Sequence, residues 1–289
     1  MYTIESDVLK VTIRSKGAEL DSIYNKQEKL EYLWSGDPAF WGKKSPVLFP
    51  IVGTLKDDTY FFKEKEYKLG RHGFAREMEF KVTGQGDDGI TLTLDSNEET
   101  LRIFPFPFRF QITYTVNANQ LAVAYIVTNT GNDDMYFSVG AHPAFRVPLA
   151  ANTSYEDYKL VFDKTENTPR WPISKDGLIE TSPLPLLENT NTLPLRKDLF
   201  LKDALVFKDL QSDLITLQSA ATPHGWSVEF PWFPYMGIWA AKNADFVCIE
   251  PWCGIADSVN TDQQLIHKEG IHSLAASDVF TCWWVLQVW

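Results

Sequence analysis

Hydrophobic and polar residues alternate in short runs along most of the chain, and long helical periodicity is nearly absent. The clearest alternating runs cover residues 9–13, 110–116 and 121–127, and residues 278–289 give a last one. A period of two predicts strands with one buried face. Because strand-like runs recur every ~8–12 residues with turn signals between them, the pattern predicts an all-β sandwich or barrel with few short helices.

One run is apolar at every position instead of every second one. Phe246 to Ile249 is uninterrupted, and Glu250 and Pro251 follow it. A strand buried on both faces gives such a run. We therefore expect Glu250 at the exit of a dry strand, where partial desolvation raises the pKa of a carboxylate and suits it to be a general base. A rim glutamate that caps an ordinary strand is the alternative interpretation.

A second stretch has the same layout. Residues 136–141 are mostly apolar and lead into His142 and Pro143. In both stretches an ionisable residue follows an apolar strand and precedes a proline, which favours extended backbone in the residue before it. The repeated layout suggests the hypothesis of an acid–base pair, His142 and Glu250, presented from two strand ends.

Several other segments have a local interpretation. Residues 37–41 are typical of a single capped helical turn with proline at its first position. Residues 84–89 formally match a dinucleotide fingerprint, but an alternating strand follows instead of a helix, so a hairpin turn is predicted. Residues 149–200, rich in Pro, Thr, Asn and Asp, predict a long irregular region with short strands.

A glycine-flanked loop, residues 70–76, gathers one histidine and two arginines. Arg71, His72 and Arg76 lie beside Gly70 and Gly73, and glycine permits the tight turns that direct polar side chains into a cleft. A charged surface loop is the alternative interpretation of this segment.

Composition narrows the class of protein. The chain has 289 residues, no linker-like shift in composition and no internal repeat, which indicates a single domain over residues 1–289. A net charge of −11 argues against nucleic acid and anionic membranes as partners. The 10 tryptophans and 11 tyrosines suit sugar binding as well as a core.

Cysteine, histidine and hydropathy patterns bear on redox state and location. Three cysteines near the C-terminus are an odd, low count, which indicates reduced thiols in a cytoplasmic protein. Neither they nor the five histidines have metal-site spacing, so no metal is expected. We see no signal peptide and no apolar run long enough for a membrane helix.

Five segments, in order along the chain, resemble motifs of the aldose 1-epimerase (galactose mutarotase-like) family, in particular its LacX-like and hexose-6-phosphate mutarotase branch. These are Pro46–Gly53, His72–Arg76, Gly140–Phe145, Asp203–Phe207 and Ile249–Trp252. The resemblance implies a large antiparallel β-sandwich, or supersandwich, and interconversion of the α and β anomers of a free aldose without a cofactor.

The same resemblance implies roles for individual residues. By match of motif, Glu250 would be the general base that removes the O1 proton, and His142 the general acid that protonates the ring oxygen. His72 would hydrogen-bond the sugar and Asp203 would anchor its hydroxyls. The sequence departs from the phosphate-sugar branch at Lys43-Lys44, where that branch has an arginine, and at Arg71, where it commonly has a glutamine.

These departures leave the substrate open. We expect a neutral hexose, with a hexose 6-phosphate as the alternative if Arg71, Arg76, Lys43 and Lys44 form a basic patch. A non-catalytic carbohydrate-binding or sensing protein on the same fold is the other alternative, because fold alone does not decide function. The sequence leaves the oligomeric state open.

Overall fold

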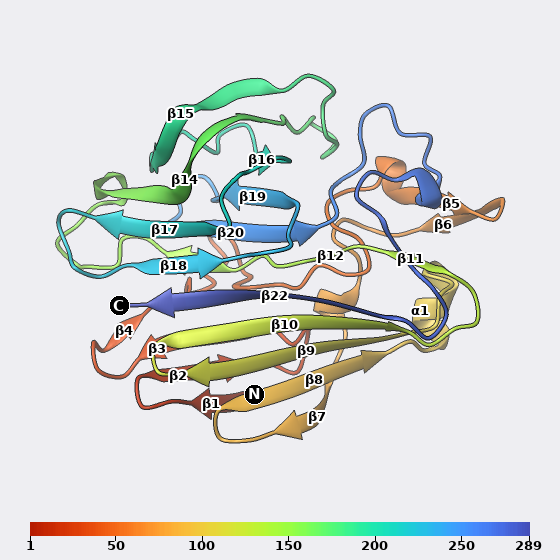
Figure 1. Ribbon diagram of the computed structural model, residues 1–289, viewed down its shortest axis with the longest axis horizontal. Coiled ribbons are helices and arrows are strands. Elements are labelled where there is room, and N and C mark those ends of the chain that lie inside the picture. Colours follow the sequence, from red (N-terminus) through yellow and green to blue (C-terminus); the bar gives the residue numbers. More distant parts are fainter.

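A nine-stranded antiparallel sheet extends from the top to the bottom of the view in Figure 1, in the computed structural model, which describes residues 1–289. Its spatial order is β15-β14-β17-β18-β22-β10-β9-β8-β7. The bounds are β7 (Lys81–Gln85), β8 (Gly89–Asp95), β9 (Phe108–Asn117), β10 (Gln120–Asn129), β14 (Tyr158–Arg170), β15 (Leu184–Pro194), β17 (Leu214–Ser219), β18 (Trp226–Glu229) and β22 (Val279–Val288).

Two smaller antiparallel sheets pack with it. One has β1 (Tyr2–Glu5), β2 (Leu9–Ile13), β3 (Leu20–Asn25) and β4 (Leu30–Glu31) in sequence order. The other runs β12 (Val139–Gly140), β20 (Phe246–Cys253), β19 (Tyr235–Trp239) and β16 (Leu205–Phe207), and β13 (Ala144–Arg146) also pairs with β20. A cluster of 72 buried residues draws side chains from all three sheets, so the predicted antiparallel β-sandwich is confirmed.

Helices are few and short, also as predicted. The one α-helix, α1 (Glu98–Ile103), begins where the Asn97 side chain accepts the Thr100 backbone N–H. Four single 3-10 turns are η1 (Lys56–Asp58), η2 (Ala75–Glu77), η3 (Tyr155–Asp157) and η4 (Leu265–His267). Two small two-stranded sheets pair β5 (Thr59–Phe62) with β6 (Lys65–Lys68) and β11 (Met135–Phe137) with β21 (His272–Leu274). None of these helices has the length and apolar character to cross a membrane.

Strand β20 is the two-face-buried strand that the sequence predicts, and all eight of its residues are buried. The expected place of Glu250 at its exit is wrong, because the strand continues through Cys253. Glu250 lies mid-strand, directly opposite Gly237 of β19. Neighbouring strands on both sides therefore hold the carboxylate in place.

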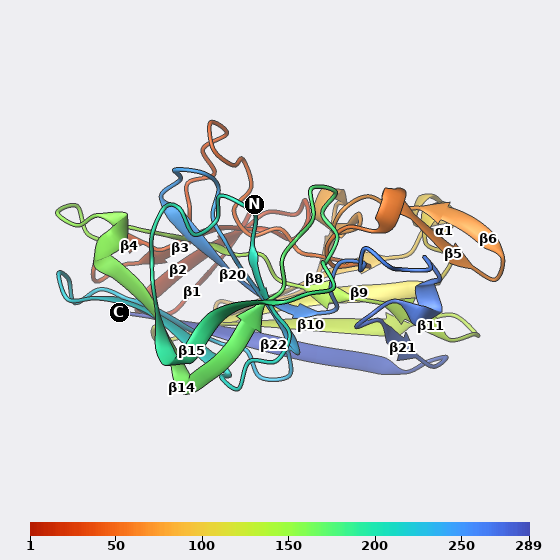
Figure 2. The same cartoon turned by 90° about the horizontal axis from the view of Figure 1, so that it is seen from above.

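The prediction for residues 149–200 is also wrong in part. Strands β14 and β15, of 13 and 11 residues, form a long antiparallel pair at the edge of the large sheet. Figure 2 shows the two strands side by side. Three register shifts interrupt their ladder between Val161 and Arg170. Such irregularities break the period-two pattern on which the sequence prediction depends.

The turn predictions hold. Residues 84–89 form the β7–β8 hairpin, where the Gly86 N–H donates to the Gly89 carbonyl over 2.8 Å. A second hairpin turn, at residues 117–120, joins β9 to β10. At residues 37–41 the Asp37 carbonyl accepts N–H groups from Phe40 and Trp41, and its side chain accepts from Ala39, which matches the expected capped turn.

Candidate active site

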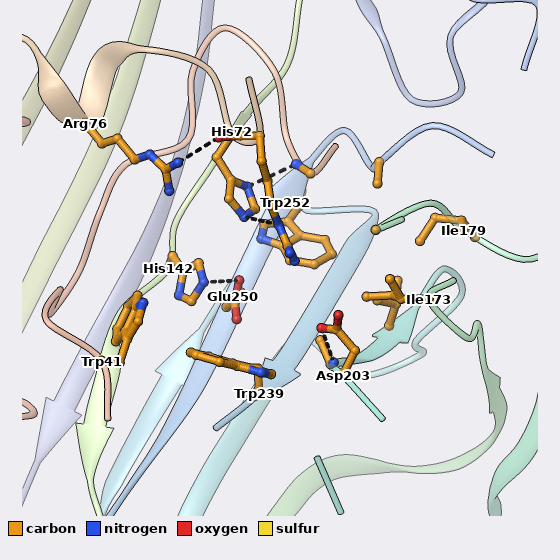
Figure 3. Close-up of a pocket in the computed structure, with 16 residues that line it drawn as sticks. Trp41, His72, Arg76, His142, Ile173, Ile179, Asp203, Trp239, Glu250 and Trp252 are labelled. Carbon is orange, nitrogen blue, oxygen red and sulfur yellow. Dashed lines mark hydrogen bonds and ion pairs between the residues drawn. The ribbon is translucent and has the colours of Figure 1, made fainter. Parts of the chain in front are cut away.

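A cavity of about 460 Å³ opens over the β12-β20-β19-β16 sheet (Figure 3). Its lining combines three tryptophans, two histidines, two arginines and two carboxylates with small or aliphatic residues. The lining residues are Trp41, Gly53, Arg71, His72, Arg76, His142, Ile173, Gly177, Ile179, Asp203, Ala204, Val206, Trp239, Glu250, Trp252 and Ala256. All six site residues expected from the sequence are among them.

His142 and Glu250 face each other at the centre of this cavity. Nε2 of the imidazole lies 3.3 Å from Oε2 of the carboxyl. The segment around His142 lies beside β20 because the Ala141 N–H donates to the Pro251 carbonyl and the Ile249 N–H donates to the Pro143 carbonyl. Backbone hydrogen bonds on either side of the pair thus fix its geometry.

Burial perturbs the ionisation of both groups. Desolvation raises the pKa of Glu250 well above its ordinary range, with Asp203 adding to the rise and the Arg71 cation opposing it. Desolvation, with smaller contributions from the Arg71 and Arg76 cations, lowers the pKa of His142 to about 3. Both effects disfavour charge and therefore favour a protonated carboxyl beside a neutral imidazole.

His72 is held by backbone groups in a defined tautomer. The backbone N–H of His72 donates to the Gly53 carbonyl over 2.8 Å, and the ring Nδ1 of His72 accepts the backbone N–H of Gly53 over 3.0 Å. Because Nδ1 is an acceptor and burial holds the pKa of the ring well below 6.5, the ring proton resides on Nε2. Arg71 Nε lies 3.3 Å from that Nε2. A neutral imidazole accepts at only one nitrogen, so the shorter contact at Nδ1 is the hydrogen bond and the Arg71 contact at Nε2 is a close approach of two N–H groups.

The backbone at this loop requires glycine after His72. Gly73 has a φ of +69°, and a Cβ there would lie 2.3 Å from the Phe49 carbonyl oxygen. The loop can therefore lie against the Phe49 segment only with glycine at this position. That packing places His72 and Arg71 on the wall of the cavity.

The basic patch considered from the sequence is only half correct. Arg76 lies at the cavity and donates from Nη2 to the Arg71 carbonyl over 2.8 Å, and neither arginine forms an ion pair. Lys43 and Lys44 lie elsewhere. Lys43 pairs with Glu77, and Lys44 pairs with Asp21, so neither lysine lines the cavity.

Asp203 lies at the opposite side of the cavity from the histidines (Figure 3). One carboxylate oxygen, Oδ1, accepts the N–H of Ala204 over 2.7 Å. The residue has a φ of +112°, an uncommon backbone conformation for a residue with a side chain. The local hydrogen bond to Ala204 leaves the second carboxylate oxygen free for a ligand.

Three tryptophans enclose the acid–base pair, and the sequence analysis did not identify them as site residues. Trp41 stacks on the His142 ring at 4.9 Å, and Trp239 meets that ring edge-on at 5.8 Å. In a sequence, an aromatic residue of a site and one of the core give the same signal. The capped turn at residues 37–41 was the available clue, since it presents Trp41.

Glycines on both neighbouring strands make room for the third indole, Trp252. A Cβ at Gly140 would lie 2.7 Å from its Cδ1, and a Cβ at Gly237 would lie 2.4 Å from its Cζ2. The indole therefore lies flat across β12, β20 and β19. Flat aromatic surfaces of this kind pack against the C–H faces of sugar rings.

A buried ion pair, Lys268 with Asp257, supports the part of the cavity wall that contains Ile179. Lys268 Nζ lies 2.8 Å from Asp257 Oδ1 and donates to the Ile255 carbonyl, while Asp257 Oδ2 accepts the Lys56 N–H. The Asp257 carbonyl accepts the N–H of Ile179, a cavity residue. This pair joins three separate chain segments behind the cavity.

Comparisons with known proteins agree with one another. The family model of aldose 1-epimerase matches residues 1–269. The plasmid-borne protein LacX of Lactococcus lactis subsp. lactis is 32% identical over 285 residues, which cover 95% of each chain.

Solved structures give the same relationship. A galactose mutarotase related enzyme from Lactobacillus acidophilus is 35% identical, with a TM-score of 0.93 over 100% of this chain and 97% of that one. A galactose mutarotase-like protein from Lactobacillus casei is 32% identical, with a TM-score of 0.94 over the whole of both chains. By its sequence and its fold, this chain belongs to the aldose 1-epimerase family.

Proposed function

We propose that the protein interconverts the α and β anomers of a free hexose, with Glu250 as general base and His142 as general acid. The observation that carries this proposal is the 3.3 Å contact between the two side chains inside a cavity lined by tryptophans. Anomerisation needs one proton removed and one delivered, and a buried acid–base pair supplies both.

The reaction follows from the positions of the two groups. Glu250 takes the proton from the anomeric hydroxyl while His142 gives its proton to the ring oxygen, and the bond between C1 and the ring oxygen breaks. Rotation about the C1–C2 bond presents the other face of the aldehyde. The ring oxygen then attacks C1, its proton returns to His142, and Glu250 returns a proton to O1. Atoms, protons and charge balance at every step.

This sequence starts with the proton on His142. Transfer from the Glu250 carboxyl to the imidazole leaves the net charge of the pair unchanged. The Arg71 cation lowers the pKa of both groups and so does not by itself favour this transfer, whereas sugar hydroxyls that donate to the carboxylate lower the pKa of Glu250 alone. Sugar binding therefore favours the ionised pair that the reaction uses.

The other cavity residues bind the sugar in this proposal. Asp203 accepts hydroxyl protons from one side, and His72 and Arg71 donate to a sugar oxygen from the other. The indoles pack on the C–H faces of the ring. These groups hold the substrate across the acid–base pair without reacting.

Polarimetry of freshly dissolved α-glucose and α-galactose tests the proposal. His142→Asn and Glu250→Gln should each lower kcat by about 10²–10⁴, the usual contribution of general acid–base catalysis, with the melting temperature little changed. Arg109→Ala is a matched control, since Arg109 pairs with Asp95 on the surface. Near-normal turnover in either active-site variant would refute the assigned roles.

A hexose 6-phosphate is the second candidate substrate, favoured by one observation. Arg71 and Arg76 line the cavity of an acidic protein and neither pairs with an acid. A guanidinium without an acidic partner suits a phosphate group. The test compares kcat/KM for each hexose and its 6-phosphate at low and high salt.

The two candidates give opposite results in that comparison. A tenfold preference for the phosphate, about 1.4 kcal/mol, that is lost in Arg71→Ala and Arg76→Ala would establish the phosphorylated substrate. Equal or better turnover of the neutral sugar in the wild-type protein would establish the free hexose.

A further inference from the structure

The acid–base pair has a third neighbour for which the proposed reaction has no use. Cys248 lies two residues before Glu250 on β20, so the two side chains project from the same face of the strand. Potential ligand atoms of Cys248, His142 and Glu250 all lie within 4.8 Å of one another, and all three residues are buried. One sulfur, one nitrogen and one oxygen donor thus converge.

We propose that these three side chains form an inhibitory binding site for Zn²⁺ or a similar late transition-metal ion. Tetrahedral zinc with bonds of about 2.0–2.3 Å separates its ligand atoms by roughly 3.3–3.8 Å. The 3.3 Å between His142 and Glu250 already matches this spacing. All three ligand atoms lie within 4.8 Å of one another, so a small rotation of the Cys248 side chain would complete the set.

The chemistry of the donors selects the ion. Thiolate and imidazole are ligands that zinc and copper prefer, whereas magnesium and calcium prefer sets made of oxygen only. A thiolate and a carboxylate together carry two negative charges, which a divalent cation cancels. The loaded site is therefore neutral, and its burial avoids the cost of an uncompensated charge.

The cavity affects metal binding in two ways. His142 and Glu250 line the cavity, so an ion can reach them from it, whereas Cys248 is fully buried behind the lining. Arg71, on the same cavity, repels a cation. We therefore expect zinc to bind more weakly here than at a structural zinc site, and we expect a chelator to remove it readily.

Bound zinc would stop catalysis because it occupies the lone pairs with which Glu250 and His142 move protons. The inhibition rests on the proposed function, whereas the binding does not. Sugar and metal would compete for one cavity. Only Cys248 is free of a role in the reaction, so it is the residue with which to test the site.

The first experiment measures binding directly, with Co²⁺ as a spectroscopic substitute for Zn²⁺ in the purified, metal-free protein. A near-ultraviolet charge-transfer band should report a cobalt–thiolate bond. The band should be displaced by Zn²⁺ and absent in both Cys248→Ser and Cys248→Ala. Two variants of similar size are used because either could lower stability on its own, and thermal melting shows which of them is folded.

Cys253→Ser is the matched control. Cys253 is another buried cysteine of β20, but it lies on the other face of the strand, where its sulfur approaches the Trp232 carbonyl. This variant should keep the cobalt band. A band that persists in the folded Cys248 variants, or disappears only in Cys253→Ser, would overturn the proposed ligand set.

The second experiment measures the functional consequence by polarimetry. Zn²⁺ should inhibit the wild-type protein, excess Mg²⁺ should not, and a chelator should restore activity. The Cys248 variants should keep their basal rate and need about tenfold more Zn²⁺ or more for inhibition, since loss of even an outer partner of a metal ligand costs that much. Equal zinc sensitivity of wild type and Cys248 variants would refute the proposal.

The two measurements separate the possible failures. A cobalt band that depends on Cys248 in a protein without anomerase activity would refute the proposed function and retain the metal site. Anomerase activity with no thiolate band would retain the function and refute the site.

Discussion

The ionisation of the buried pair predicts an unusual pH profile for the proposed reaction. Catalysis requires that His142 and Glu250 together hold one proton. A second proton must go to His142, whose pKa burial lowers to about 3, and loss of the last proton is opposed by burial of Glu250. The one-proton state therefore persists from about pH 3 up to the raised pKa of Glu250.

The size of the pKa shift of His142 follows from comparison with an ordinary histidine. An imidazole with a pKa near 6.5 would lose its neutral form around that pH, whereas His142 keeps it to about pH 3. At 1.36 kcal/mol per pKa unit this difference corresponds to about 5 kcal/mol against the imidazolium. Burial of the ring is the main cause, and the Arg71 cation adds to it because it repels a second positive charge.

The assay is kcat/KM from polarimetry at low sugar concentration, since that ratio reports the free enzyme. Rates of the uncatalysed reaction are subtracted at each pH, and circular dichroism verifies that the protein stays folded in acid. We expect a plateau through pH 5, an acid limb well below the ordinary histidine pKa and a decline on the alkaline side.

A matched variant tests the electrostatic part of this reasoning. Arg71 lowers the pKa of both His142 and Glu250, so Arg71→Ala should move both limbs of the profile to higher pH. An acid limb of the wild-type enzyme with its midpoint near 6.5 would refute the argument. So would limbs that stay in place when the arginine is removed.

Two further predictions concern binding and stability. Asp203→Asn should mainly raise KM. It should also move the alkaline limb of the pH profile to lower pH, because the Asp203 charge raises the pKa of Glu250. A large loss of kcat with unchanged KM would instead show that Asp203 takes part in the chemical step. Lys268→Ala leaves the Asp257 carboxylate buried without its cation, so it should lower the free energy of unfolding by about 3–5 kcal/mol in denaturant titrations. The exposed control Lys63→Ala should lower it by less than about 1 kcal/mol. Similar losses in both lysine variants would show that the buried pair has no special role.

Much of the fold is predictable because the pattern has a simple physical cause. Residues 110–116 and 121–127 alternate since one face of β9 and of β10 is buried, and β20 does not alternate since both of its faces are. The pattern fails between residues 158 and 194, where register shifts move side chains from one face to the other. Period-two reasoning carries no information about such shifts.

The site is predictable in part. The repeated layout suggests Glu250 and His142 as an acid–base pair, and the family motifs add His72 and Asp203, but the 3.3 Å contact of the pair depends on the pairing of β12 and β13 with β20. The same pairing decides what the lysines do. Lys43 and Lys44 precede a motif segment, yet local acids, Glu77 and Asp21, pair with them away from the cavity.

The cavity also explains why a stable fold keeps groups that oppose its stability. Glu250 is buried mid-strand beside a neutral imidazole, and His142 has a ring nitrogen without a partner. Each costs free energy of folding, since buried polar groups are ordinarily satisfied. The backbone ladders of β12, β13 and β19 with β20 hold both groups against that cost. Residues that lower stability while their surroundings fix their geometry are the expected sign of a preorganised catalytic site, and the unpaired Arg71 beside them has the same character.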